Sequence, residues 1–175
     1  MATYIHNNFR NRLNGCSGGY ISNINNRPKT ILANGNEATM SSAHTMAIGA
    51  IFLYSSTSSV QNQIGCAYLS SSDAVLTNEY TCPDLLTDIT PASNSATWTY
   101  DSKSGKTSGV WSVVNNAGTA QTVRKVAVYF STSTGNINSS PSNYSLQFVI
   151  DLDTPVTIPA GETGVISISI DFSNI

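Results

Sequence analysis

The end of the chain constrains its fold most strongly, because residues 166–172 alternate strictly between apolar and polar side chains. A period of two places the apolar side chains on one face of a β-strand and the polar ones on the other. Pro159, Gly161 and Gly164 come before this stretch and are typical of a turn. The sequence therefore predicts a strand, a turn and a final strand in an antiparallel sheet with one solvent-facing side.

Several earlier stretches also predict strands: residues 47–54, 96–100, 110–114, 123–130 and 144–151. For the first of these a helix over residues 43–51 is the open alternative. Within the last two stretches, the alternation predicts two inward-facing sets: Val126, Val128 and Phe130, and then Tyr144, Leu146, Phe148 and Ile150. Residues 115–119 predict a turn made of residue types that tolerate a positive φ. Short strands and turns without a strong amphipathic helix are typical of a β-sandwich. We predict an all-β fold, an antiparallel β-sandwich of jelly-roll or immunoglobulin-like type, over residues 43–175.

Residues 1–42 are polar and rich in Asn, and we predict an extended N-terminal arm with one short helical turn. Residues 1–36 contain four basic residues and no acidic one, whereas residues 144–175 contain four acidic residues and no basic one. This asymmetry is either chance in a chain with few charges, or the mark of an arm that docks on an acidic patch of a neighbouring subunit. The residues predicted to make such contacts are Tyr4, Phe9, Arg10, Arg12, Arg27 and Lys29.

The composition favours a protein that packs against other proteins. Only 10% of the residues are charged, against roughly 25% in an average soluble protein, and the net charge is −2. Such a neutral surface suits packing against many copies or neighbours, and also suits a secreted β domain. Four basic residues in the arm are too few to indicate nucleic-acid binding, and there is no apolar run of about 18 residues to predict a membrane span. The first residues do not resemble a secretion signal, so we expect synthesis in the cytoplasm.

The search for catalytic or metal-binding residues finds no convincing set. His6 and His44 are the only histidines, and neither has a metal ligand at a typical spacing. A Ser/His/Asp triad stays open because triads assemble from distant residues, but no GxSxG motif is present. Asp151 and Asp153 could bind Ca²⁺ or act as an acid/base pair, although a solvated strand end is the simpler interpretation. We therefore expect no enzyme activity, no cofactor and no metal.

The three cysteines, Cys16, Cys66 and Cys82, are an odd number without CxxC spacing. This pattern argues against a disulfide framework or a zinc site, and leaves a Cys66–Cys82 bridge open.

Five aromatic residues of the predicted sandwich form a glycan platform if they face outward: Trp98, Tyr100, Trp111, Tyr129 and Tyr144. The glycan contacts predicted among them are Trp98, Tyr100 and Trp111. Aromatic side chains in a sandwich are more often part of the core. A glycan-binding or host-adhesion module is therefore the alternative function.

Residues 108–175 carry a recognisable order of motifs. An Asn-Ala-Gly-Thr-Ala turn over residues 116–120 precedes a strand that ends at Tyr129, and a Pro-Val-Thr-Ile-Pro-Ala-Gly-Glu segment over residues 155–162 precedes the last alternating strand. This order resembles the closing module of many tailed-bacteriophage virion proteins, and also immunoglobulin-like adhesion modules of bacterial surfaces.

The phage resemblance implies a non-enzymatic β-sandwich component of a virion: a capsid decoration, neck or tail accessory protein that acts through multi-copy assembly. It implies a homo-oligomer whose partners are other copies and neighbouring virion proteins, located in the virion after synthesis in the host cytoplasm. An arm that adds a strand to the sheet of a neighbouring subunit would fit this role.

Overall fold

The computed structural model describes residues 3–10, 29–39, 65–77, 79–101, 103–104, 106–131 and 144–171. A short helix covers residues 7–10. The strands of the described residues are β1 (Thr3–Ile5), β2 (Lys29–Ile31), β3 (Glu37–Thr39), β4 (Gly65–Ser70), β5 (Ile89–Asp101), β6 (Lys106–Asn115), β7 (Gln121–Ser131), β8 (Tyr144–Ile158) and β9 (Thr163–Asp171). The strand predicted over residues 47–54 lies outside the described part.

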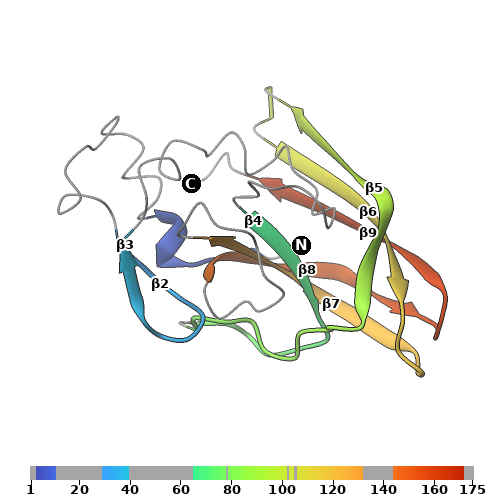
Figure 1. The fold of residues 1–175 in the computed structure, drawn as a ribbon. Helices are drawn as coiled ribbons and strands as arrows, with labels where there is room; N and C mark the ends of the chain where they lie inside the picture. The colour runs from blue at the N-terminus through green and yellow to red at the C-terminus, as the bar shows by residue number, and fades with distance from the viewer. Residues whose placement is uncertain are drawn as a thin grey trace.

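Two antiparallel sheets face each other and form a β-sandwich (Figure 1). The four-stranded sheet has the order β1-β8-β7-β4, and the three-stranded sheet has the order β5-β6-β9. Strands β2 and β3 form a separate hairpin. The all-β antiparallel sandwich predicted from the sequence is therefore confirmed.

The main hydrophobic core lies between the two sheets. Strands β7 and β8 contribute from one side, and β6 and β9 contribute from the other. In β7 a register shift between Val123 and Lys125 places both Val123 and Val126 in this core. The buried members of this core are Phe9, Ile89, Val113, Val123, Val126, Val128, Phe148, Ile150, Ile158, Ile166 and Ile168.

The four-stranded sheet also carries a second hydrophobic cluster on its other face. Its buried members are Cys82, Ala127, Tyr129, Leu146 and Val149, and side chains from residues 68–85, Tyr4 and Ala33 pack against them. This sheet is therefore covered on both faces, which explains why every residue from 145 to 150 is buried.

A bulge at Gln147 corrects one prediction about β8. Val128 pairs with Phe148 and the next residue, Tyr129, pairs with Leu146, so Gln147 is skipped in the ladder. Because one extra residue reverses the alternation of faces, Leu146 belongs to the second cluster while Phe148 and Ile150 belong to the main core. The predicted shared face of Leu146, Phe148 and Ile150 is therefore wrong for Leu146.

The predicted strand, turn and final strand at the end of the chain are confirmed, with an addition that the sequence did not give. β8 pairs with β7, whereas β9 pairs with β6, so the turn over residues 159–162 crosses from one sheet to the other. Gly161 in this turn has a φ of 75°, a value that glycine adopts without strain.

The predicted turn after β6 is also present, but the described residues with a positive φ are only Gly35, Asp84 and Gly161. The side chain of Asn115 closes this turn instead: its Oδ1 accepts the Ala117 N–H at 2.9 Å and its Nδ2 donates to the Thr119 carbonyl at 2.9 Å.

Candidate functional site: the docked N-terminal segment

The N-terminal segment, residues 3–10, is part of the sandwich and does not extend away from it. β1 pairs with Phe148, Val149 and Ile150 of β8 and so forms one edge of the four-stranded sheet. Phe9 is 2% exposed and stacks edge-on against Phe148, with 5.7 Å between the ring centroids. Of the arm predicted over residues 1–42, residues 3–10 are therefore docked on their own chain. This docking buries Phe9 and pairs the edge of β8 with β1.

Asn8 is the main polar anchor of this segment. It is 1% exposed, and its Nδ2 donates to the carbonyls of Leu146 at 3.0 Å and Ile31 at 2.8 Å. Its Oδ1 accepts the Ile31 N–H at 2.8 Å. One side chain therefore joins the N-terminal segment to both the four-stranded sheet and the β2–β3 hairpin, which lie side by side in Figure 1.

His6 forms the second anchor. It is 3% exposed, and its Nδ1 accepts the backbone N–H of Asn8 at 3.0 Å. The backbone N–H of His6 donates to the Gln147 carbonyl at 2.9 Å, at the bulge of β8. The rings of Tyr4 and Tyr80 stand edge-on to the imidazole, with centroids 6.2 and 6.1 Å away. Burial lowers the pKa of His6, because the charged ring would lose its hydration.

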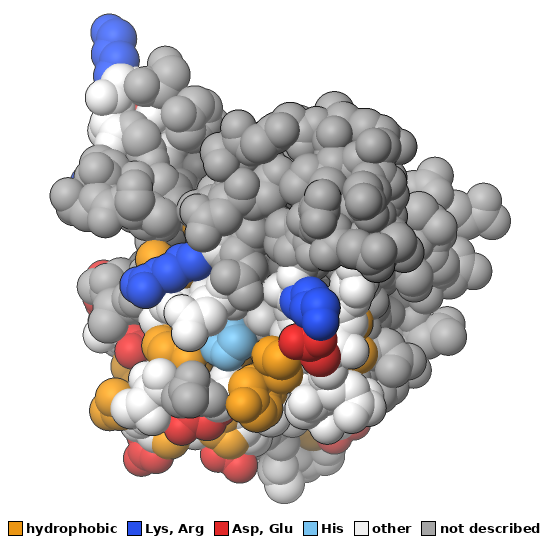
Figure 2. Space-filling model, turned by 90° about the vertical axis from the view of Figure 1, so that its left-hand side faces the viewer, with side chains coloured by type: hydrophobic (Ala, Val, Ile, Leu, Met, Phe, Trp, Pro, Cys, Tyr) orange, Lys and Arg blue, Asp and Glu red, His pale blue; other side chains and the backbone are white. Residues whose placement is uncertain are grey.

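The surface around the segment combines apolar and charged side chains. Figure 2 shows this face, where a histidine is visible among hydrophobic side chains, with Lys or Arg and Asp or Glu side chains near it. Arg10 is exposed. Lys29 forms an ion pair with Glu37 across the β2–β3 hairpin, and both side chains are more than half exposed. Burial, followed by the charge of Glu79, raises the pKa of Tyr4.

The residues predicted for the arm are only partly brought together. The structure brings Tyr4, Phe9 and Arg10 together in one segment, with Lys29 on the adjoining hairpin, and it buries Phe9 in the main core. Arg12 and Arg27 lie outside the described residues. Sequence reasoning missed Asn8 because a single amide residue in an Asn-rich stretch carries no periodic signal. It missed Gln147 because the bulge there depends on how β7 pairs with β8.

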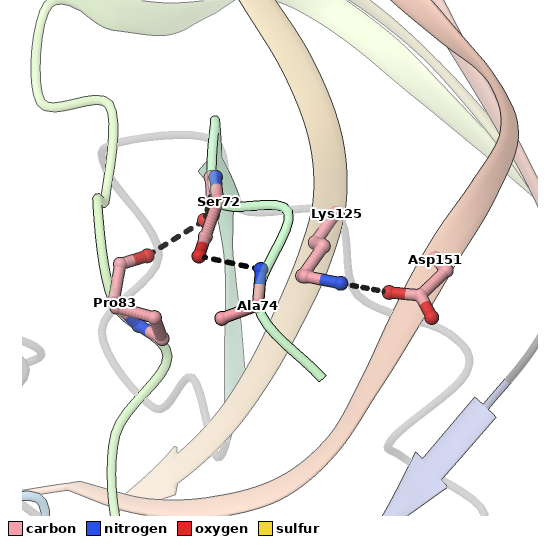
Figure 3. Close-up of polar contacts among 6 residues, drawn as sticks. Ser72, Ala74, Pro83, Lys125 and Asp151 are labelled. Atoms are coloured by element: carbon pink, nitrogen blue, oxygen red, sulfur yellow. Dashed lines mark hydrogen bonds and ion pairs between the residues drawn. The ribbon is translucent and has the colours of Figure 1, made fainter. Parts of the chain in front are cut away.

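A second polar cluster lies where β4, β7 and β8 run side by side. Lys125 is opposite Ser70 in β4 and opposite Asp151 in β8, and its ammonium pairs with the Asp151 carboxylate (Figure 3). The Ser70 hydroxyl donates to the Pro83 carbonyl at 2.6 Å and accepts the Ser72 N–H at 3.0 Å. These contacts hold the loop after β4 against the sheet. The Ser70 hydroxyl, the Lys125 ammonium and the Asp151 carboxylate therefore each have a partner within the fold.

This arrangement settles two expectations. Asp151 and Asp153 lie within β8 and not at its end, since β8 continues to Ile158. Asp151 is partly exposed and pairs with Lys125, whereas Asp153 is exposed. A lysine within the apolar run of residues 123–129 was a signal for such a partner. Cys82 is buried with a free thiol, so it forms no bridge with Cys66, and burial raises its pKa.

The predicted glycan contacts occupy the three-stranded sheet. Trp98 is opposite Gly109, and Trp111 is opposite Ile166. Tyr129 is fully buried, so its predicted place in an exposed glycan platform is wrong. The side chains of Trp98, Tyr100, Trp111 and Tyr144 are not among those described, so their part in the platform stays a prediction.

Comparisons with protein-family models, curated proteins and solved structures find no match. Among the described residues, no three His, Cys, Asp or Glu side chains gather in a group that could hold a metal ion. Within the same ranges, no helix is long and apolar enough to cross a membrane.

Proposed function

We propose that this chain is a non-enzymatic structural component of a bacteriophage virion, a capsid decoration, neck or tail accessory protein, which acts by multi-copy assembly. The phage assignment rests on the sequence resemblance of residues 108–175. The assembly role rests on one structural observation, an uncharged area on the outer face of β6 and β9.

This outer face is formed by residues of β6 and β9 that alternate with core residues. Val113, Ile166 and Ile168 point into the sandwich and are buried. The alternate positions form the valine–serine face, which consists of Ser108, Val110, Ser112, Val114, Val165, Ser167 and Ser169. No residue of β6 between Lys106 and Asn115, or of β9 before Asp171, is charged.

Two valines make this face suited to protein contact. Val110 is 43% exposed and Val165 is 55% exposed. Ser112 pairs with Val165 and Ser167 pairs with Val110, so the two valines are diagonal neighbours on one surface. Covering uncharged side chains requires no desolvation of ions, and interface centres are depleted of charge for this reason. The occupant we propose for this face is another copy of the chain.

The proposed role is tested by the solution mass of the full-length protein, measured by light scattering over a range of concentrations. We expect a defined oligomer, and we expect Val110→Lys or Val165→Lys to shift it towards monomer because a charge would be buried at the contact. Val75→Lys is the matched control, since Val75 is 85% exposed but lies on the loop after β4.

A protein that is monomeric at all concentrations, or an oligomer that tolerates both sheet substitutions, would argue against assembly through this face. In that case a glycan array becomes the next measurement. Sugar binding that is lost in Trp98→Ala or Trp111→Ala, with the fold intact, would support the adhesion function instead.

The basic residues of the arm need a separate test. Removing residues 1–36 would take Phe9 out of the core, so a deletion could not distinguish lost docking from lost stability. Reversing charges avoids this problem, because Arg10 is exposed. We expect Arg10→Glu to fold normally and to assemble more weakly, with the difference reduced at high salt. Unchanged assembly in this variant would argue against docking through Arg10.

A further inference from the structure

The bond between His6 and Asn8 can form only with a neutral histidine. Nδ1 of His6 accepts the Asn8 N–H at 3.0 Å. A ring nitrogen accepts a hydrogen bond only without its own proton, so the docked ring carries its single proton on Nε2. Protonation would place two N–H groups against each other at this contact.

We propose that protonation of His6 releases the N-terminal segment, residues 3–10, from the four-stranded sheet, so that acidification exposes this segment and the strand edge beneath it.

Among the described residues, no carboxylate pairs with His6 to balance a positive charge. Tyr4 from the same segment and Tyr80 from the loop after β4 present neutral rings at its edge. Gln147 from β8 accepts the backbone N–H of His6, and its side-chain amide donates to the carbonyl and hydroxyl of Ser145.

The remaining charged groups near this segment are exposed or already paired. Arg10, at the end of the short helix, is exposed and has the same sign as a protonated His6. On the hairpin, Glu37 is paired with Lys29. On the loop after β4, Glu79 is exposed. Its charge helps to raise the pKa of Tyr4, whereas the lowered pKa of His6 comes from burial.

Loss of the His6 contact would displace Asn8, which holds three further hydrogen bonds. The backbone of Asn8 bonds to His6, and its side chain bonds to Leu146 and Ile31. Moving this residue therefore breaks its bonds to the sheet and to the hairpin together. β1 adds only three ladder pairs to the segment, so few other backbone contacts hold it in place.

The direction of the pH effect follows from proton linkage. Burial lowers the pKa of His6 in the docked state, whereas the released histidine has the ordinary value of about 6.5. The released state therefore binds more protons between these two pKa values, and docking weakens as the pH falls below about 6.5. The equilibrium constant changes by up to about tenfold per pH unit in this window.

Hydrogen exchange of the full-length protein, followed by mass spectrometry at pH 7.5 and 5.0 and corrected for intrinsic rates, tests this proposal. We expect the protection of residues 3–10 to fall about tenfold or more at pH 5.0, while peptides from β7 and β9 keep theirs. His6→Asn should remove the pH dependence, because an amide oxygen can accept the Asn8 N–H and does not titrate. His44→Asn, the matched control, should retain it.

Two results would overturn the proposal: equal protection of residues 3–10 at both pH values in the wild-type protein, or an equal loss in His6→Asn. A nitrogen NMR titration of the wild-type protein gives an answer even if His6→Asn folds poorly. A His6 pKa at or above 6.5, or a proton on Nδ1 at neutral pH, would contradict the mechanism.

Discussion

Gly164 lies so close to Ile158 that a side chain at position 164 has no room. A Cβ atom at Gly164 would lie 2.6 Å from both Cγ1 and Cδ1 of Ile158. Ile158 is 1% exposed and packs in the main core, so it has little space to move. This contact is at the crossing from β8 to β9, where the chain passes from one sheet to the other.

Gly164→Ala should therefore destabilise the sandwich. The added methyl group must displace Ile158 or the backbone, and overpacking of this kind costs about 1–3 kcal/mol. The free energy of unfolding in urea, followed by circular dichroism, measures the effect.

Ile158→Ala supplies the control for this contact, because it removes both atoms that the new methyl group would meet. Gly164→Ala should then add much less destabilisation than it does alone, with a coupling of about 0.5–3 kcal/mol. Simple additivity of the two changes would show that the cost of Gly164→Ala comes from the backbone and not from Ile158.

The alternating strands were predictable because a strand buried on one face has apolar residues at every second position. Val126 and Val128 share the core-facing side of β7 as expected, and the strand–turn–strand at the end of the chain is present. The bulge at Gln147 was not predictable, since it depends on how β7 and β8 pair over the whole ladder. The docking of the N-terminal segment was missed for a related reason: Asn8 binds residues 23 and 138 positions away, and no local pattern records that.

Tyr129→Phe tests how the second cluster holds the loop after β4. Tyr129 is fully buried, and its hydroxyl accepts the Cys82 N–H at 2.7 Å and lies 3.0 Å from the Thr81 hydroxyl oxygen. Phenylalanine keeps the ring but leaves a buried N–H without its acceptor, so we expect a loss of about 1–3 kcal/mol. Urea unfolding gives this number, and hydrogen exchange of Cys82 should increase. Unchanged exchange at Cys82 would mean that other contacts hold the loop.

The pair of Lys125 and Asp151 predicts an asymmetry between two substitutions. The Lys125 side chain is 7% exposed, whereas that of Asp151 is 46% exposed. Asp151→Asn leaves a buried ammonium without its counter-charge, and we expect it to cost about 1–3 kcal/mol, less than for a fully buried pair. Lys125→Met removes the buried charge itself and should change stability by less than about 1 kcal/mol. Thermal unfolding of both variants at pH 7 decides between them, and a larger loss for Lys125→Met would show that the pair contributes net stability.

Asn115 joins the two turns at one end of the sandwich. It is fully buried, and its Nδ2 donates to the carbonyls of Thr119 at 2.9 Å, Ile158 at 2.9 Å and Pro159 at 3.2 Å. Its backbone carbonyl accepts the Gly161 N–H at 2.8 Å. A single amide therefore ties the turn after β6 to the turn that crosses between the sheets.

Asn115→Asp keeps the shape of this side chain but replaces the donating group with a carboxylate oxygen, which would face three carbonyl oxygens. We expect a loss of about 3 kcal/mol or more at pH 8, because the buried charge is repelled and unsatisfied. The pKa of the new carboxyl group should be raised in the folded state, so the penalty should grow as the pH rises above its unfolded value of about 3.9. Urea unfolding of the variant and the wild type at pH 5 and pH 8 isolates this difference from the titration of His6. Asn115→Ala, which removes the donor without adding a charge, should show a loss that does not depend on pH. If Asn115→Asp matches Asn115→Ala at both pH values, the charge is reaching solvent and the two turns are less tightly joined than their hydrogen bonds indicate.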